Sequence, residues 1–418
     1  MNQTKTNITL LLPLFMVIFL DVAGIILALP VLTPLILQPS SGMVPIGTPA
    51  IWRDFLYGAS LGIFPLFMFF STPVLGDLSD RFGRKKILMI CLIGSGLSYI
   101  VAAIGVLGNS LLMLLASRAM AGLAAGTQSI ATAAIIDLSP TPQIRTKNLA
   151  WVVFSCSIGL ILGPAIGGIT AEKSLVSWFG YETPFFFAAG VSFLNAILLQ
   201  FTLKETESEK SPHAIHLTKG FRLFIAAFAE KKFRLLSILH ACFVLAWSLY
   251  YQTINWFFME KYHYTAEKLG LFVSFVGIVF AITTSVVVRF ILRLFSSETK
   301  LFAFFIFTMG IANVGAALAH TEMAQWLWSI LNATSDVICF TIALGLFSNL
   351  ANHESQGWIM GVTGSIGALT WTVGGLIAGP LGYISLRVPL WTAGVLCFIS
   401  FLLMVVFQKT HASESTTN

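Results

Sequence analysis

The segment Ile8–Leu37 reads ITLLLPLFMVIFLDVAGIILALPVLTPLIL, and it decides which class of fold is possible. A helix needs about 20 apolar residues to cross the hydrocarbon core of a bilayer, which is about 30 Å thick. The segment exceeds this length. Its apolar residues are continuous rather than alternating, which favours a helix over a strand of a membrane barrel. Asp21 lies near its middle. The segment therefore predicts a membrane-spanning helix that carries one carboxylate.

The whole chain has the same apolar character. Its 418 residues are 56% hydrophobic and only 10% charged, with a mean hydropathy of +0.86, whereas a soluble domain carries about 25% charged residues. Twelve apolar runs have spanning length: 9–37, 52–75, 87–107, 110–136, 147–171, 184–203, 233–258, 268–291, 301–319, 324–348, 357–380 and 387–407. The sequence therefore predicts an all-α membrane protein with twelve transmembrane helices. The length of the first run predicts that it stays as a span and is not cleaved as a signal peptide.

The basic residues predict the orientation of these helices, because loops on the cytoplasmic side of a membrane are rich in Lys and Arg. Most of the 24 Lys and Arg residues fall at the termini and in loops that follow even-numbered spans. Both termini are therefore predicted to be cytoplasmic. The net charge of +6 reflects this asymmetry, so we do not expect a nucleic-acid partner.

One long hydrophilic connection divides the chain. It covers residues 204–232, begins with charged residues and then becomes amphipathic, which is typical of a helix on a membrane surface. GLILGPAIGG in the fifth span is echoed by GGLIAGPLGY in the eleventh. The sequence predicts a six-helix bundle over residues 1–203, a cytoplasmic linker over 204–232 and a second, pseudo-symmetric bundle over 233–418. Duplicated halves of this kind are common in secondary transporters.

Four stretches carry a resemblance to a known family. They are LDVAGIILALPVL (Leu20–Leu32), GDLSDRFGRKKIL (Gly76–Leu88), LLASRAMAGLAAG (Leu114–Gly126) and SIGLILGPAIGG (Ser157–Gly168). Together they resemble the major facilitator superfamily, and more narrowly its twelve-helix drug:proton antiporters, which include the tetracycline exporters. The fourth-span stretch departs from the family pattern, because Ala121 stands where the family has Gln.

The stretch after the second span is the most specific of the four, and we call its first ten residues the gating motif. Its predicted functional residues are Gly76, Asp77, Asp80, Arg81, Gly83, Arg84 and Lys85. We expect the two glycines to form the tight turn between two helices. We expect Asp80 to pair with Arg84 or Arg81, and Asp77 to face a helix N-terminus, where negative charge is stabilised. Such a cluster would latch the cytoplasmic side; the alternative is an ordinary positively charged loop.

The fifth span places small residues four apart on one helix face, where they allow close helix packing. The residues of this packing motif are Gly159, Gly163, Pro164, Gly167 and Gly168. Pro164 weakens the helix locally and permits a bend. In the resembled family this motif marks exporters, which favours export; the alternative is ordinary small-residue packing.

Charged residues inside the spans are the candidates for proton coupling. Each costs about 2.5–3.5 kcal/mol at a helix centre, so it normally faces a cavity or a partner. We predict that Asp21 alternates between a protonated state and a state paired with Arg118 or with a cationic substrate. The alternative is a permanent Asp21–Arg118 ion pair. Asp336 in the tenth span is a second coupling candidate, or a helix–helix polar contact. Asp137, near a span end, is expected to be solvated or to cap a helix.

The seventh span is rich in aromatic residues and supplies candidates for the substrate cavity. These are Tyr250, Tyr251, Asn255 and Trp256, together with Asn332 of the tenth span. In the resembled superfamily the first, fourth, seventh and tenth helices line a central cavity, which would suit an amphipathic or cationic aromatic ligand. The alternative is an aromatic belt at the membrane interface.

These observations predict a secondary transporter of a bacterial-type inner membrane that exports a small amphipathic molecule by alternating access, driven by protons. No G-x4-GK[ST] loop, HExxH motif or spaced Cys/His set is present, so we expect no ATP use, no metal and no enzyme activity. The expected partners are a small-molecule substrate and the lipid bilayer, with the proton gradient in place of a cofactor and the chain acting as a monomer. Two alternatives stay open: proton-coupled uptake of a nutrient, amino acid or metal chelate such as a siderophore, and a non-transporting receptor on the same fold.

Overall fold

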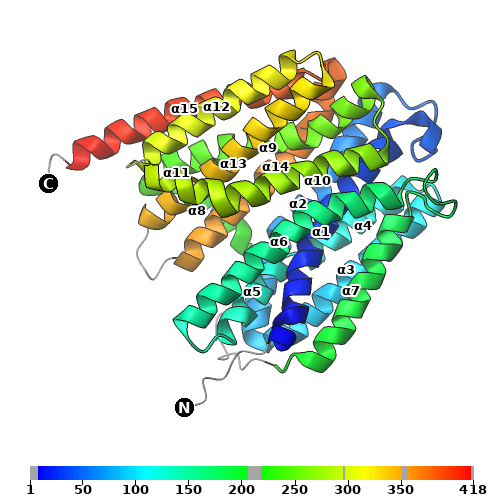
Figure 1. The fold of residues 1–418 in the computed structure, drawn as a ribbon, viewed down its shortest axis with the longest axis horizontal. Coiled ribbons are helices and arrows are strands. Elements are labelled where there is room, and N and C mark those ends of the chain that lie inside the picture. Colours follow the sequence, from blue (N-terminus) through cyan, green and yellow to red (C-terminus); the bar gives the residue numbers. More distant parts are fainter. Residues whose placement is uncertain (1–7, 206–217, 295–296, 351–355, 416–418) are drawn as a thin grey trace. The chain divides into compact units, whose positions relative to one another are not determined.

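The computed structural model describes residues 8–205, 218–294, 297–350 and 356–415, and Figure 1 shows the course of the chain. Across these ranges the regular structure is helical and contains no strand. Twelve helical stretches are long and apolar enough to cross a membrane. Helices suit this environment because each satisfies its own backbone hydrogen bonds where no water is present. The predicted fold class, an all-α protein with twelve spans, is confirmed.

The spans before the hydrophilic connection are α1 (Ile8–Leu37), α2 (Ala50–Phe82), α3 (Arg84–Leu107), α4 (Leu111–Ala124) with α5 (Thr127–Asp137), α6 (Pro142–Thr170) and α7 (Thr183–Thr202). The spans after it are α9 (Lys231–Tyr262), α10 (Ala266–Ile282) continued through a π-helical turn (Thr283–Val287) into α11 (Val288–Leu294), α12 (Glu298–Leu318), α13 (Glu322–Leu350), α14 (Gln356–Ile384) and α15 (Val388–Ser415). A short 3-10 helix, Pro39–Ser41, follows α1.

Between the two sets lies α8 (Lys219–Ala229), in the amphipathic part of the predicted linker. Residues 206–217 of that linker are outside the described residues. The Arg234 guanidinium donates to the carbonyls of Phe228 and Ala229, each at 2.8 Å, and so satisfies acceptors at the end of α8. The last carbonyls of a helix lack partners within it, so this contact stabilises the junction of α8 with α9.

Contacts along the chain define two compact units. Unit 1 comprises Met1–Gly47, Leu66–Lys219 and Tyr264–Phe275, and unit 2 comprises Thr48–Pro65, Gly220–His263 and Val276–Asn418. The first part of α2 therefore belongs to unit 2, and the first part of α10 belongs to unit 1. The predicted domain boundaries at residues 203 and 233 stay a prediction.

Unit 1 is built around α1, which lies alongside α6 (Figure 1) and also contacts α5 and α7. Its buried apolar cluster draws side chains from α1, α3, α5, α6 and α7, including Leu14, Ile18, Leu88, Ile135 and Leu199. In unit 2, α9 packs against α14 and α15, and α12 packs against α13 and α15. The first part of α2 lies close to α14, because a Cβ on Gly58 would overlap the Gly375 carbonyl.

Candidate functional site

The fourth span is interrupted within unit 1. α4 ends at Ala124 and α5 begins at Thr127, with Gly126 between them at a φ of 103°. Residues other than glycine rarely adopt a positive φ. A Cβ at Gly126 would also lie 3.1 Å from Thr72 Oγ1, so space and backbone conformation both favour glycine. The predicted single fourth helix is therefore two helices.

The Asp21 carboxylate caps the beginning of α5. Its Oδ2 atom accepts a hydrogen bond from the backbone N–H of Gln128 at 3.1 Å, and the Thr127 side chain is a second polar neighbour of the same carboxylate. The first N–H groups of a helix have no acceptor within it, and the N-terminus carries partial positive charge. Gly126 provides no side-chain cap. Asp21, on α1, supplies the missing acceptor. Its negative charge complements the partial positive charge at the N-terminus of α5.

The other side of the interruption is satisfied by α2. The Ser71 hydroxyl donates to the carbonyl of Gly122 at 2.8 Å. An unsatisfied backbone group within a membrane costs several kcal/mol. The break is thus stabilised on both sides by side chains of other helices, α1 and α2.

Arg118 lies on α4 and is 5% exposed. The Asp21 carboxylate accepts a hydrogen bond from the backbone N–H of Gln128. Tyr99 of α3 is within electrostatic range of both charged groups. Its hydroxyl lies against Gly24, where a Cβ would overlap it. The predicted alternation of Asp21 between a protonated state and a state paired with Arg118 stays a prediction. Tyr99 is a neighbour of both residues that was not predicted from the sequence.

The gating motif has a shorter turn than expected. α2 continues through Gly76 to Phe82, and only Gly83, at a φ of 101°, separates it from α3. The prediction that Gly76 takes part in the turn is wrong. Within this last part of α2 the Ser79 hydroxyl donates to the Gly76 carbonyl at 2.8 Å, and the N–H of Gly83 donates to the Ser79 carbonyl at 3.1 Å.

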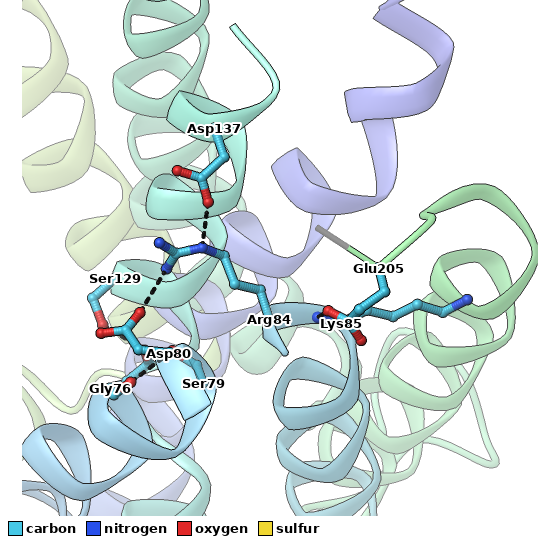
Figure 2. Close-up of polar contacts among 9 residues, drawn as sticks. Gly76, Ser79, Asp80, Arg84, Lys85, Ser129, Asp137 and Glu205 are labelled. Atoms are coloured by element: carbon cyan, nitrogen blue, oxygen red, sulfur yellow. Dashed lines mark hydrogen bonds and ion pairs between the residues drawn. The ribbon is translucent and has the colours of Figure 1, made fainter. Parts of the chain in front are cut away.

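Arg84 joins two carboxylates, as Figure 2 shows. Its Nη1 atom lies 3.4 Å from Asp80 Oδ1, and its Nε donates to Asp137 Oδ2. The predicted pairing of Asp80 with Arg84 is present. Asp137 is the last residue of α5, and it pairs with Arg84 rather than acting only as a solvated or capping residue. The gating motif is thereby tied to the second half of the fourth span.

The other residues of the motif have separate contacts. The Arg81 guanidinium lies over the Phe82 ring, 5.4 Å from its centroid. The Lys85 ammonium donates to the Gln200 carbonyl at 2.8 Å. Asp77 is half-buried on α2, and its predicted place at a helix N-terminus stays a prediction.

Glu205 caps the N-terminus of α3, a role that was not predicted from the sequence. Its Oε1 atom accepts from the backbone N–H of Lys85 at 3.0 Å (Figure 2). A Cβ on Gly83 would overlap this carboxylate. Gly83 is needed both for its positive φ and for the space that admits Glu205.

We expect Gly83→Ala to destabilise the protein by about 1–3 kcal/mol, the usual cost of a sparsely populated backbone conformation for a residue with a Cβ. The measurement is thermal unfolding of the purified protein in detergent. Gly76→Ala is the matched control, because a Cβ there meets nothing within 4 Å and alanine favours a helix interior. Equal unfolding temperatures for the two variants would contradict this account of the turn.

The glycines of the packing motif lie against α1. Three of them stand four residues apart on α6 and face α1 carbonyls four residues apart: Gly159, Gly163 and Gly167 against Phe19, Ala23 and Leu27. Such close approach is possible only without side chains at these positions. Asp21 lies in the stretch of α1 that is held in this way.

Gly168 faces a different helix. A Cβ there would overlap the carbonyl of Ala266 and lie 3.0 Å from Gly270 Cα, both in the part of α10 that belongs to unit 1. Pro164 lies inside α6, and its carbonyl in turn faces Gly270. The motif thus serves two helix contacts on α6.

In unit 2, Asp336 lies on α13 and is 6% exposed. No hydrogen bond or ion pair joins its carboxylate to another of the described residues. One turn earlier, Asn332 exchanges amide hydrogen bonds with Asn313 of α12, at 3.2 and 3.4 Å. An unpaired buried carboxylate costs several kcal/mol, a cost that a proton would remove. The predicted coupling role of Asp336 stays a prediction.

The cavity candidates of the seventh span are mostly interior. Tyr250 is fully buried and donates to the Ser329 hydroxyl at 2.7 Å. Asn255 is also fully buried. Trp256 is 6% exposed and packs edge-on against Tyr57 with ring centroids 5.9 Å apart. Asn332 is buried as well, so among the five candidates only Tyr251 is partly exposed in this structure.

We expect Tyr250→Phe to lower the free energy of unfolding by about 1 kcal/mol, because it removes one buried hydrogen bond. Thermal unfolding in detergent measures the loss. Tyr251→Phe is the control, since the Tyr251 hydroxyl makes no hydrogen bond among the described residues, and its unfolding temperature should match that of the unmodified protein. If Tyr251→Phe lost stability and Tyr250→Phe did not, the stabilising hydrogen bond would belong to Tyr251 and not to Tyr250.

Comparison with curated proteins finds relatives that span nearly the whole chain. The tetracycline resistance protein of class B from Escherichia coli is 25% identical over 99% of this chain and 98% of its own length. Multidrug resistance protein 1 of Bacillus subtilis is 28% identical over 99% of this chain and all of its own length.

Among solved structures, the human organic anion transporter MFSD10 matches 95% of this chain and 99% of its own, with a TM-score of 0.70 and 20% identity, a likeness that shows the fold. The sequence model described as Major Facilitator Superfamily matches residues 11–375. This match covers most of the chain, and the twelve spans agree with it. The chain therefore belongs to the Major Facilitator Superfamily, and it is a multi-pass membrane transporter.

Proposed function

We propose that this transporter exports a small amphipathic molecule in exchange for protons, by alternating access. The observation that carries the proposal is the Asp21 carboxylate, placed within a membrane span on the N-terminus of α5. Ionisable groups inside a membrane usually serve transport or proton transfer. Relatives named for tetracycline and multidrug resistance support export and an amphipathic substrate.

The proton and the substrate compete in this scheme. A proton that enters from outside neutralises Asp21 and weakens the binding of a cationic or polar group of the substrate, which leaves outward. When the proton leaves on the inner side, the charged carboxylate is restored and new substrate binds. Arg118, buried on α4, would favour the charged form whenever its guanidinium approaches the carboxylate.

The distribution of Lys and Arg along the chain supports an orientation of the protein in the membrane. We propose that both termini are cytoplasmic, that the protein resides in a bacterial inner membrane and that it acts as a monomer. The partners are then the small-molecule substrate and the bilayer, and the proton gradient supplies the energy.

One observation favours a second candidate, proton-coupled uptake. Arg118 is a buried cation on the fourth span, and it could bind an anionic group of a nutrient or chelate directly. The two candidates differ in the direction in which a proton gradient drives the substrate.

Inside-out vesicles that contain the protein test the direction. Tetracycline, a quinolone and the aromatic cation ethidium are the probes, and the vesicle interior is made acidic. Export predicts that at least one probe accumulates inside and that collapse of the gradient releases it. Accumulation only when the vesicle interior is alkaline relative to the outside would instead indicate uptake.

A further inference from the structure

The helix α5 stands between two charged contacts. Its first turn receives the Asp21 carboxylate through the N–H of Gln128, and its last residue, Asp137, accepts from Arg84 of the gating motif. The helix has 11 residues. At 1.5 Å per residue it is about 16 Å long, so the groups at one end of α5 cannot interact directly with the groups at the other end.

The interruption at Gly126 separates α5 from α4, so α5 is a short rigid body with ends of its own. Its sides pack in the buried cluster of unit 1, to which it contributes Ile130, Ala131, Ala134 and Ile135. The polar contacts of Asp21 and Asp137 are at its two ends.

The surroundings of Asp21 show which groups could replace the helix end as its partner. In the described part of the chain, titratable side chains close to Asp21 include Cys91 and Tyr99 of α3 and Cys156 of α6. Each of them is neutral in its ordinary form. Arg118 is a charged group close to Tyr99.

We propose that α5 is the positioning element of the proton-coupling site and a mechanical link from it to the gating motif. The N–H of Gln128 and the Thr127 side chain hold the charged form of Asp21. When Asp21 takes a proton, this contact loses its charge-assisted character, and α5 is released from α1. The movement reaches Asp137 at the other end and weakens its pair with Arg84. This inference rests on the proposed proton coupling, in which Asp21 is the carrier.

The link predicts a property that two unconnected sites do not have. Substitutions more than about 10 Å apart with no shared partner normally have additive effects on stability. If α5 joins the two contacts, replacing the charged contact at one end by a weaker neutral one lowers the cost of weakening the contact at the other end. Asp21→Asn and Asp137→Asn should therefore be non-additive.

The test is a double-mutant cycle on the full-length protein, with thermal unfolding in detergent at pH 8 as the readout. We expect Asp21→Asn and Asp137→Asn together to lower the unfolding temperature by less than the sum of the single effects. Glu205→Gln is the matched control, because Glu205 also binds the gating motif but does so from outside α5. The combination of Asp21→Asn with Glu205→Gln should be additive.

Limited trypsin digestion of the same samples supplies a second readout. Cleavage after Arg84 and Lys85 of the gating motif should be several-fold faster for Asp21→Asn and for Thr127→Val than for the unmodified protein. Thr132→Val controls for the loss of a threonine hydroxyl from α5, since the Thr132 hydroxyl donates within its own helix, to the Gln128 carbonyl. It should leave cleavage unchanged.

Additive effects for the Asp21 and Asp137 pair, or equal cleavage rates for Thr127→Val and Thr132→Val, would overturn the link. Neither readout depends on transport. If the unmodified protein moved no protons while the cycle was non-additive, the proposed function would fail and the structural link would stand. If protons moved but the cycle was additive, the link alone would fail.

Discussion

Asp21→Asn should reduce proton-coupled transport to the level of vesicles that lack the protein. The substitution removes the only charge on α1 within the membrane, and an amide cannot take up and release a proton. The amide oxygen can still accept the hydrogen bond from Gln128, because asparagine is a good cap of a helix N-terminus. We therefore expect a folded protein that has lost coupling.

A pH-sensitive dye inside inside-out vesicles measures this loss. Addition of a transported amphipathic cation should dissipate an inside-acid gradient in the unmodified protein and leave it intact in Asp21→Asn. Asp54→Asn is a suitable control, because Asp54 is another buried acid of a span, 8% exposed on α2, to which we assign no coupling role. Full gradient-driven transport by Asp21→Asn would remove Asp21 from the mechanism.

Gly167→Ala should destabilise the protein by about 1–3 kcal/mol, the usual cost of an overpacked contact. A Cβ at Gly167 would overlap the Leu27 carbonyl of α1. Backbone atoms of a membrane helix cannot rotate away as a side chain can, so α1 and α6 must separate. We expect the loss to appear as a lower unfolding temperature and as lower transport, because α1 also carries Asp21.

Gly190→Ala is the matched control for Gly167. It lies on α7 in the same unit, and a Cβ there meets nothing within 4 Å. Alanine is more favourable than glycine in a helix interior by about 0.5–1 kcal/mol, so this variant should be unchanged or slightly more stable. If both variants unfolded at the same temperature, the close packing of α1 on α6 would not contribute to stability.

The fold was largely predictable because hydropathy over about 20 residues is a direct consequence of bilayer thickness. All twelve apolar runs correspond to spans. The exceptions are local. The break at Gly126 was not predicted, because one glycine in an apolar run is common in membrane helices and carries no sign of its φ. The continuation of α2 through Gly76 was not predicted either, because glycine is common in turns and its presence alone does not show that it lies inside a helix.

The candidate site was predictable only where one residue carries an energetic cost by itself. Asp21, Arg118 and Asp336 stand out because charge is expensive in a membrane span. Their neighbours do not stand out. Tyr99 and Gln128 are ordinary residues of other spans, and Glu205 is one acid in a charged connection. They come to the site through helix packing, which a single sequence does not reveal.

The central claim is that proton and substrate compete for one carboxylate. Its most direct test is proton release from the purified protein in a weakly buffered detergent solution near neutral pH, on addition of a transported amphipathic cation. We predict that binding releases protons in the unmodified protein and releases none in Asp21→Asn. Binding of the cation to the unmodified protein with no proton release, or with proton uptake, would contradict the claim.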